Sequence, residues 1–359
     1  MKLKMVDTVQ KKSFEKLFAE QLNGVSDFKS YITTFVKPFS VMVSEIFRDE
    51  NLVKSDCGTY LSSPLKAFFS NPGKCSRPLS CLLANSAYSG NVSDCIYSAL
   101  ALETFQNAAL IHDDIADDAL TRRDKPCMHI DEGVPVALNA GDYALTMVDA
   151  LILEDEHLDA TLKLKVLKEV SDMKLNTIKG QAMDIGWARD HEFDLSLEDY
   201  EKMATLKTAH YTFATPFVIG AAIAGADNEQ LECLRQYGLK CGLAFQIKDD
   251  LSNVDENRKD TTKDFALDVR EGKRTLIAIH AINNLDNSDK KRLIEILDSE
   301  NNTEEDVDEA LAFFQSSNSL NFAKTRCKEL AKEARLLISQ ISHDNHATKL
   351  IKSIPEWCL

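Results

Sequence analysis

Asp113-Asp114-Ile115-Ala116-Asp117-Asp118 places four carboxylates within six residues, at the end of an apolar run over 99–111. This run predicts a helix, because it is rich in Ala and Leu and no Gly or Pro occurs over 91–124. On a helix, Asp113 and Asp117 share a face, where like charges repel each other unless a cation lies between them. A hard divalent cation such as Mg²⁺ takes such oxygen ligands and is usually shared with substrate phosphates.

A second stretch repeats this pattern farther along the chain. An apolar helix through 242–245 leads into Asp249 and Asp250, and Asn253 offers a further oxygen ligand one turn later. Two acidic helix ends that face each other would hold Mg²⁺ ions against a polyphosphate. One acidic cluster alone is more often a solvated helix end, but two in one helical chain favour a metal site.

Basic residues stand near turn signals and beside the acidic stretches. Arg suits bidentate contact with phosphate, whereas Lys acts as a point charge. Any one of these residues is usually an ordinary surface cation, but their placement together predicts a phosphate-bearing substrate. The set comprises Lys74, Arg77, Arg122, Arg123, Lys207, Lys263 and Lys273.

Helical periodicity dominates the 359 residues, 44% of which are hydrophobic. Strand-like alternation is nearly absent, and no linker is long enough to divide domains. We therefore predict an all-α fold, a single domain over 1–359 that forms a bundle of ten or more helices, with an N-terminal helical extension over 1–50. The first acidic stretch is expected on a helix over 92–121, followed by a polar loop over 121–126.

Charge and cysteine content bear on partners and compartment. The net charge of −15 argues against nucleic acid or an anionic membrane surface as a general partner. Nine cysteines without a CxxC pair indicate reduced thiols in a cytoplasmic protein, not a disulfide framework or a zinc site. The longest uncharged apolar stretch, 213–226, is too short to span a bilayer, so no transmembrane segment is expected.

Taken together, these motifs resemble those of the trans-isoprenyl diphosphate synthases from about residue 71 to 281. Asp113-Asp114-x-x-Asp117, followed by Arg122-Arg123, is similar to the first aspartate-rich motif of that family, and Phe245-Gln246-x-x-Asp249-Asp250 to its second. The segment 73–78, Gly-Lys-x-x-Arg-Pro, looks like the clamp for isopentenyl diphosphate (IPP). The remaining motifs follow in the family's order: Gly180-Gln181, Lys207-Thr208, Lys263 and Gly272-Lys273.

The resemblance implies an isoprenoid synthase fold around a central apolar cavity and a Mg²⁺-dependent, homodimeric prenyltransferase. It would condense IPP with an allylic diphosphate (dimethylallyl, geranyl or farnesyl) by ionisation, condensation and elimination. Carried over residue by residue, the metal-binding acids would be Asp113, Asp114, Asp117, Asp249 and Asp250.

The substrate ligands implied by the resemblance fall into three groups. IPP would bind Lys74, Arg77 and Arg123, helped by Gln106. Many relatives have His at the position of Gln106. The allylic diphosphate would bind Arg122, Lys207 and Lys263, with Lys273 as a further substrate-binding residue. The dipoles of Thr208 and Gln246 would face the allylic cation. His112 adjoins the acidic stretch, but we interpret it as structural and not as a base.

Two positions depart from the family pattern. Asn253 stands where many members have the third Asp of the second motif, and an amide is a poorer Mg²⁺ ligand than a carboxylate. Asp124 stands where a Gly usually follows the arginine pair, which adds negative charge near an anion site.

Product length should depend on the helix that precedes Asp113. Ala108 and Ala109 lie about one turn before it, at roughly 1.5 Å per residue, and leave room for a prenyl tail longer than C15. Phe105 lies about two turns before it and would form the floor of the tunnel. We therefore predict geranylgeranyl diphosphate (C20) over a C15 product, with a C25 product as the alternative. If Phe105 packs elsewhere in the core, this ruler does not apply.

Two other functions remain open at the level of the sequence. A class I terpene cyclase on the same scaffold would use one prenyl diphosphate and no IPP, although Lys74, Arg77 and Arg123 would then have no substrate to hold. A non-catalytic subunit that pairs with an active synthase is disfavoured, because both acidic motifs are largely intact.

Overall fold

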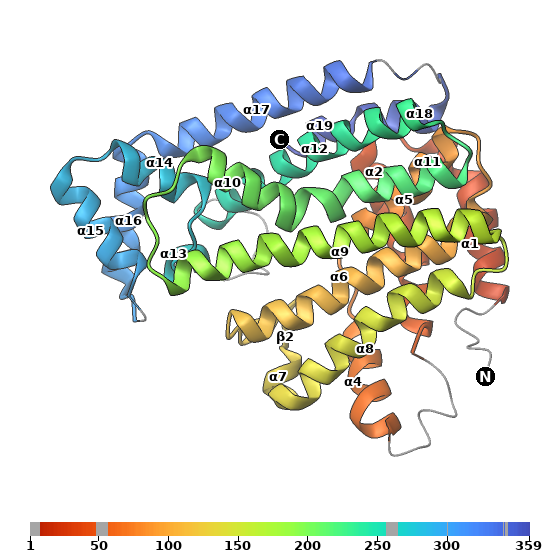
Figure 1. The fold of residues 1–359 in the computed structure, drawn as a ribbon, viewed down its shortest axis with the longest axis horizontal. Helices are drawn as coiled ribbons and strands as arrows, with labels where there is room; N and C mark the ends of the chain where they lie inside the picture. Colours follow the sequence, from red (N-terminus) through yellow and green to blue (C-terminus); the bar gives the residue numbers. More distant parts are fainter. Residues whose placement is uncertain (1–7, 48–56, 256–264, 300, 340, 342–343) are drawn as a thin grey trace. The chain divides into compact units, whose positions relative to one another are not determined.

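The computed structural model describes residues 8–47, 57–255, 265–299, 301–339, 341 and 344–359. More than ten α-helices occur in this part of the chain, and its one sheet is a two-stranded hairpin. The all-α prediction is therefore confirmed (Figure 1). Contacts group the chain into unit 1, which comprises 1–171, 215–235 and 341–354, and unit 2, which comprises 172–214, 236–340 and 355–359. The single domain and its central cavity stay predictions.

Unit 1 contains the first acidic stretch and the helices around it. Its elements are α1 (Thr8–Gln21), α2 (Phe28–Glu45), α4 (Ser63–Phe69), α5 (Ser76–Ala87), α6 (Ile96–Ala116), β1 (Thr121–Arg122), β2 (Lys125–Pro126), α7 (Met128–Asp131), α8 (Val134–Leu153), α11 (Thr215–Ile223) and α18 (His346–Lys352), with the short turns η1 (Leu22–Gly24), η2 (Gly58–Ser62) and η3 (Val92–Asp94). It also includes the first part of α9 (Ala160–Arg189) and of α12 (Asn228–Asn253).

Helix α6 is the central element of unit 1. Almost every side chain from Ile96 to Ala108 is buried, on all sides of the helix. The helix packs against α8 along much of its length and against α5. A helix that is apolar all round must be enclosed by others, and this enclosure fixes the position of the acidic stretch at its end.

Unit 2 contains the second acidic stretch. Its own elements are α10 (Leu197–Ala204), the π-helix η4 (Thr205–Ala214), α13 (Leu267–Arg270), α14 (Leu276–Asn284), α15 (Asn287–Leu297), α16 (Glu304–Ser316) and α17 (Ser319–Ile338), together with the later parts of α9 and α12 and most of α19 (Ile354–Trp357).

The end of α12 is held from the C-terminal side of the chain. The indole of Trp357 stacks on Phe245 with ring centroids 5.3 Å apart. The amine of Lys248 donates to the Trp357 carbonyl at 2.6 Å. Phe245 and Lys248 lie within one turn of Asp249, so the contacts with Trp357 hold the part of α12 that carries the second acidic stretch.

One helix in the described part of the chain, α8, is long and apolar enough to cross a membrane by length and composition. The sequence argument considered only uncharged stretches and therefore chose 213–226. Helix α8 is longer but contains two charged residues, Asp142 and Asp149. Of its most apolar 18-residue window, 44% is buried, and α6 is its main packing partner.

Candidate active site

The first acidic stretch ends helix α6. The helix stops at Ala116, with Asp117 as its C-cap, and not at 121 as predicted. Asp113 and Asp117 are half-exposed, whereas Asp114 is only 1% exposed and forms an ion pair with the guanidinium of Arg122. Burial raises the pKa of the Asp114 carboxyl, and Arg122 opposes that rise. The two half-exposed carboxylates therefore lie where a cation can reach them.

A hairpin follows the helix where the sequence predicted a polar loop. Thr121 and Arg122 of β1 pair with Pro126 and Lys125 of β2. The turn residues Arg123 and Asp124 have φ angles of 53° and 62°. Asp adopts this left-handed conformation more readily than most residues but less readily than Gly. The departure at Asp124 is thus a substitution at a turn position, and its exposed side chain lies at the tip of the hairpin.

The predicted IPP ligands of unit 1 lie close together in three segments. Arg123 donates to the carbonyl of Asn71, and the Asn71 amide donates back to the Arg123 carbonyl at 3.1 Å. These two hydrogen bonds join the hairpin turn to the segment that carries Lys74 and Arg77. Gly73 makes the approach possible, since a Cβ there would lie 2.7 Å from the Arg123 guanidinium. Gln106, which is buried, comes from α6.

The second acidic stretch contains a chain of hydrogen bonds. The Tyr200 hydroxyl donates to Asp250 at 2.6 Å, and the Gln246 amide donates to the other oxygen of Asp250 at 2.8 Å. The Thr208 hydroxyl in turn donates to the carbonyl oxygen of Gln246 at 2.7 Å. Burial raises the pKa of Asp250 to about 8, with Asp268 as a second cause. Asp249, by contrast, is half-exposed.

Lys207 lies within the π-helix η4 that continues α10. Its amine forms an ion pair of 2.5 Å with Asp184 of α9. The backbone of α9 approaches that of η4 so closely at this point that a Cβ on Gly180 would lie 2.2 Å from the Lys207 nitrogen. Irregular helical turns of this kind occur often at functional sites. The predicted helical bundle did not anticipate this π-helix.

The remaining residues of the second stretch have clear structural partners. The side-chain oxygen of Asn253 accepts from the Asp268 backbone N–H at 3.1 Å, which holds the start of α13 against the end of α12. Lys273 pairs with Glu271 at 2.6 Å. Asn253 thus has a structural role that accounts for its burial. Lys263 lies outside the described residues.

The predicted product-length residues lie on the enclosed part of α6. Phe105 and Ala108 are buried, and Ala109 is half-exposed. His112, one turn farther along, lies 3.4 Å from the Leu138 carbonyl and from an Asp142 oxygen, both of α8. These contacts agree with the interpretation of His112 as a residue of helix packing.

The described residues fit a Mg²⁺ site that is completed by substrate. Among them, no group of three or more His, Cys, Asp and Glu side chains forms a ready metal cage. Mg²⁺ usually binds one or two carboxylates, several waters and the phosphates of a substrate. Asp113 with Asp117, and separately Asp249, offer half-exposed oxygens of that kind.

Sequence reasoning did not select three residues that the structure places beside the predicted ones. They are Glu103 near the IPP ligands, Asp184 at Lys207 and Tyr200 at Asp250. Glu103 carried a signal, because an acid inside an otherwise apolar run needs a partner. Tyr200 lies 50 residues from Asp250, and no local pattern links the two.

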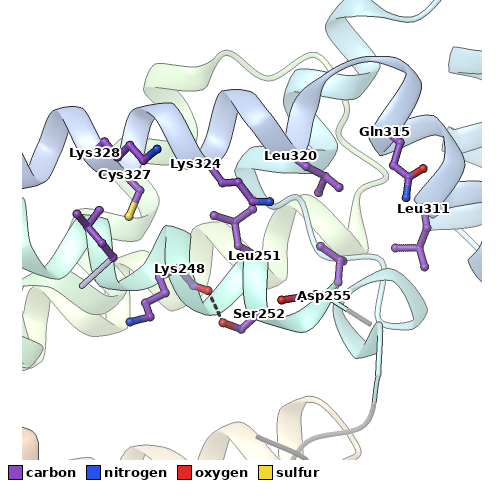
Figure 2. Close-up of a pocket in the computed structure, with 12 residues that line it drawn as sticks. Lys248, Leu251, Ser252, Asp255, Leu311, Gln315, Leu320, Lys324, Cys327 and Lys328 are labelled. Atoms are coloured by element: carbon purple, nitrogen blue, oxygen red, sulfur yellow. Dashed lines mark hydrogen bonds between the residues drawn. The ribbon is translucent and has the colours of Figure 1, made fainter. Parts of the chain in front are cut away.

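Unit 2 also has a pocket of about 450 Å³ on another face of α12. Figure 2 shows Lys248, Leu251 and Ser252 of α12, with Asp255 just beyond its end, opposite Lys324, Cys327 and Lys328 of α17. None of its lining residues belongs to the predicted site. Since Asp249 and Asp250 project from the intervening positions of the helix, this pocket is separate from the second acidic stretch.

Comparison with known families gives a match over most of the chain. The family model described as polyprenyl synthetase matches residues 59–314. A short chain isoprenyl diphosphate synthase of Methanocaldococcus jannaschii is 34% identical over 252 residues, which cover 70% of this chain and 75% of that protein. A geranylgeranyl diphosphate synthase of Saccharolobus solfataricus is 29% identical over 324 residues, or 89% of this chain and 96% of that protein.

Solved structures match the fold over nearly its whole length. The geranylgeranyl pyrophosphate synthase of Corynebacterium glutamicum, complexed with isoprenyl diphosphate and magnesium, aligns with a TM-score of 0.84 at 25% identity. The alignment covers 93% of this chain and 99% of that structure. The acidic helix ends and basic segments described above therefore lie in a chain whose fold is that of these synthases.

Proposed function

The chain belongs to the polyprenyl synthetase family and is a trans-prenyltransferase, and from this premise we propose that it condenses IPP with an allylic diphosphate to make geranylgeranyl diphosphate. The proposal includes Mg²⁺ as the metal and a cytoplasmic homodimer as the working form. None of the nine cysteines forms a disulfide, which supports a reducing compartment.

The observation that carries the use of IPP is the basic cluster of unit 1. Lys74 and Arg77 come from one segment, and Arg123 is tied to that same segment through Asn71. One buried acid, Glu103, offsets part of the repulsion among these three cations. The diphosphate of IPP would add further negative charge, with Arg for bidentate contact and Lys as a point charge. A cyclase has no second diphosphate for this cluster to bind.

A second set of residues suits the allylic partner. We assign Arg122, Lys207 and Lys263 to the diphosphate of that substrate. The hydroxyl proton of Thr208 is committed to Gln246, and the Gln246 amide is committed to Asp250. A lone pair on the Thr208 oxygen then remains to face positive charge on the allylic carbon, which is electrostatic stabilisation of the transition state.

Asp113, Asp117 and Asp249 would hold Mg²⁺ together with the substrate's phosphates, with Asp114 and Asp250 as the buried acids behind them. When bound, Mg²⁺ supplies charge neutralisation for the leaving diphosphate. Arg122 and Lys207 would supply further positive charge for that diphosphate. The last proton has no protein base in this proposal, because the released diphosphate can accept it.

Product length rests on α6. Ala108 and Ala109 are small, and Phe105 is buried one turn before Ala109. We assign Phe105 as the floor of the tunnel. Phe105→Ala is expected to lengthen the product beyond C20, and Ala109→Phe to shorten it, as measured by chromatography of the dephosphorylated products. If neither substitution changes chain length, the ruler is wrong.

Incubation with Mg²⁺ and farnesyl diphosphate, with and without IPP, tests the proposal. We expect a C20 diphosphate that forms only when IPP is present. A hydrocarbon that forms without IPP would identify a cyclase, and an absence of turnover under both conditions would favour a non-catalytic subunit.

A further inference from the structure

Glu103 is a buried acid to which the roles above give no part. It lies in the middle of α6 and is 2% exposed. It stands three residues before Gln106, so the two side chains share a face of the helix. An ionised carboxylate at such a depth is costly unless cations or hydrogen-bond donors surround it. Its neighbours therefore explain why it is tolerated.

One neighbour is the segment that carries Lys74 and Arg77. Cys75, between them, donates its thiol to a carboxylate oxygen of Glu103 at 3.6 Å. Cys75 begins helix α5 and has a φ of 46°, a left-handed conformation that non-glycine residues adopt only under tertiary constraint. The contact with Glu103 is part of that constraint, and it fixes the backbone from which both cations project.

The other neighbours are two guanidiniums. Burial raises the pKa of Glu103, while Arg123 and then Arg77 act against that rise. The Glu103 carboxylate is likewise the first charge that counteracts the effect of burial on Arg123. Arg122 and Arg77 have the opposite influence on Arg123, as like charges must. One carboxylate thus lies within the electrostatic reach of two arginines that repel each other.

Segments 71–77, 103–106 and 121–124 are far apart in sequence, yet all three contribute to this cluster. Every residue assigned to IPP, namely Lys74, Arg77, Gln106 and Arg123, lies on one of them. Glu103 is the acid that the three segments share. Without the Glu103 carboxylate, the two guanidiniums would turn towards water or towards other acceptors. They would then lose the fixed orientation that bidentate contact needs.

We propose that Glu103 is the positioning residue of the IPP site, whose buried carboxylate orients the guanidiniums of Arg77 and Arg123 towards the diphosphate. This inference rests on the proposed function. Glu103 does not touch the substrate; it acts through the two arginines and through the Cys75 segment.

The test is Glu103→Gln in the full-length enzyme, with steady-state kinetics for both substrates. The amide has the size of the carboxylate but no charge, so its electrostatic attraction for the guanidiniums of Arg77 and Arg123 is lost. We expect KM for IPP to rise about tenfold, the fold-change of one charge interaction, while KM for farnesyl diphosphate and kcat at saturating IPP stay within about twofold.

Glu169→Gln is the matched control. Glu169 is a largely buried acid of the same unit and pairs with Arg235 at 3.0 Å, away from the IPP cluster. Its loss should lower thermal stability without changing either KM. Glu103→Asp keeps the charge but withdraws it by one methylene from the arginines, and should raise KM for IPP selectively, by about threefold.

The outcomes separate this inference from the function on which it rests. If the unchanged enzyme makes no IPP-dependent product, the proposed function fails. If that enzyme is active but Glu103→Gln leaves KM for IPP unaltered, or raises both KM values equally, Glu103 is a structural acid and the inference fails. Should Glu103→Gln not fold, calorimetric binding of IPP to Glu103→Asp decides, since a selective loss of IPP affinity supports the inference and unchanged affinity overturns it.

Discussion

The ends of α6 and α12 carry the same dipeptide, Asp-Asp, and bury the same member of it. Asp113 and Asp249 are half-exposed, while Asp114 and Asp250 are buried. The partners of the buried members differ. Asp114 meets a guanidinium, whereas Asp250 meets a hydroxyl and an amide. One sequence pattern thus gives one geometry but two ways of compensating a buried acid.

This difference has an electrostatic consequence. Burial raises the pKa of both carboxyls, and at Asp114 the nearby cation opposes the rise. At Asp250 the partners are neutral, Asp268 adds to the rise, and the pKa reaches about 8. We infer that the half-exposed acid of each pair serves the metal and that the buried acid fixes its neighbour's position.

The largest expected effect separates these two roles. Asp113→Asn and Asp249→Asn should each lower kcat/KM by at least about a hundredfold, because a charge that stabilises the leaving group is lost. Their melting temperatures should change little, since neither side chain is buried. A large drop in stability with retained activity would reverse the roles assigned within each pair.

The next largest effect compares the stability that the partners of Asp114 and of Asp250 contribute. Arg122→Met leaves a buried carboxylate without its cation and should cost about 3–5 kcal/mol of unfolding free energy. Tyr200→Phe removes one hydrogen bond from Asp250 and should cost about 1–3 kcal/mol. Denaturant unfolding measures both.

The double variant Asp114→Asn, Arg122→Met serves as the control for the first of these. It should recover part of the stability lost in Arg122→Met, because the uncompensated charge is gone. If Arg122→Met and Tyr200→Phe lower the unfolding free energy equally, the distinction between charged and neutral partners is contradicted.

A smaller effect concerns the hairpin that follows only the first acidic stretch. Asp124 has a φ of 62°, so Asp124→Gly should raise stability by about 0.5–1 kcal/mol. Asp308→Gly, at an exposed position inside α16, should lower it by a similar amount. If both substitutions destabilise the protein, the turn is not under backbone strain.

The smallest effect uses a half-buried acid, Asp306, as the reference for the buried acids Asp114 and Asp250. Asp306 accepts from the backbone and hydroxyl of Thr303 and pairs with Arg292, which together lower its pKa from 3.8 to about 2. A lowered pKa stabilises the fold above pH 3.8, and this contribution is lost as the pH falls through about 2. Asp306→Asn should therefore be less stable at pH 6, with the difference shrinking between pH 4 and 2.

Much of this architecture could be predicted from local patterns. The helices predicted to carry the first and the second acidic stretch correspond to α6 and α12. Periodicity and capping are encoded by residues three or four apart, so they are visible in the sequence. The pairing of Asp114 with Arg122 is nearly as local, eight residues apart.

Three features could not be predicted, for physical reasons. The end of α6 at Ala116 and the hairpin turn depend on residues that tolerate positive φ without being Gly. The π-helix at Lys207 depends on the close approach of α9 at Gly180. The partners Tyr200 of Asp250 and Cys75 of Glu103 are brought together only by the tertiary fold.

The stoichiometry of pyrophosphate release tests the central claim most directly. The enzyme would be given Mg²⁺, farnesyl diphosphate and isotopically labelled IPP, with pyrophosphate and labelled product measured in the same sample. We predict one pyrophosphate released for each IPP incorporated into a C20 diphosphate, and almost none when IPP is omitted. Pyrophosphate release that continues undiminished without IPP would contradict the account, because the basic cluster of unit 1 would then have no part in turnover.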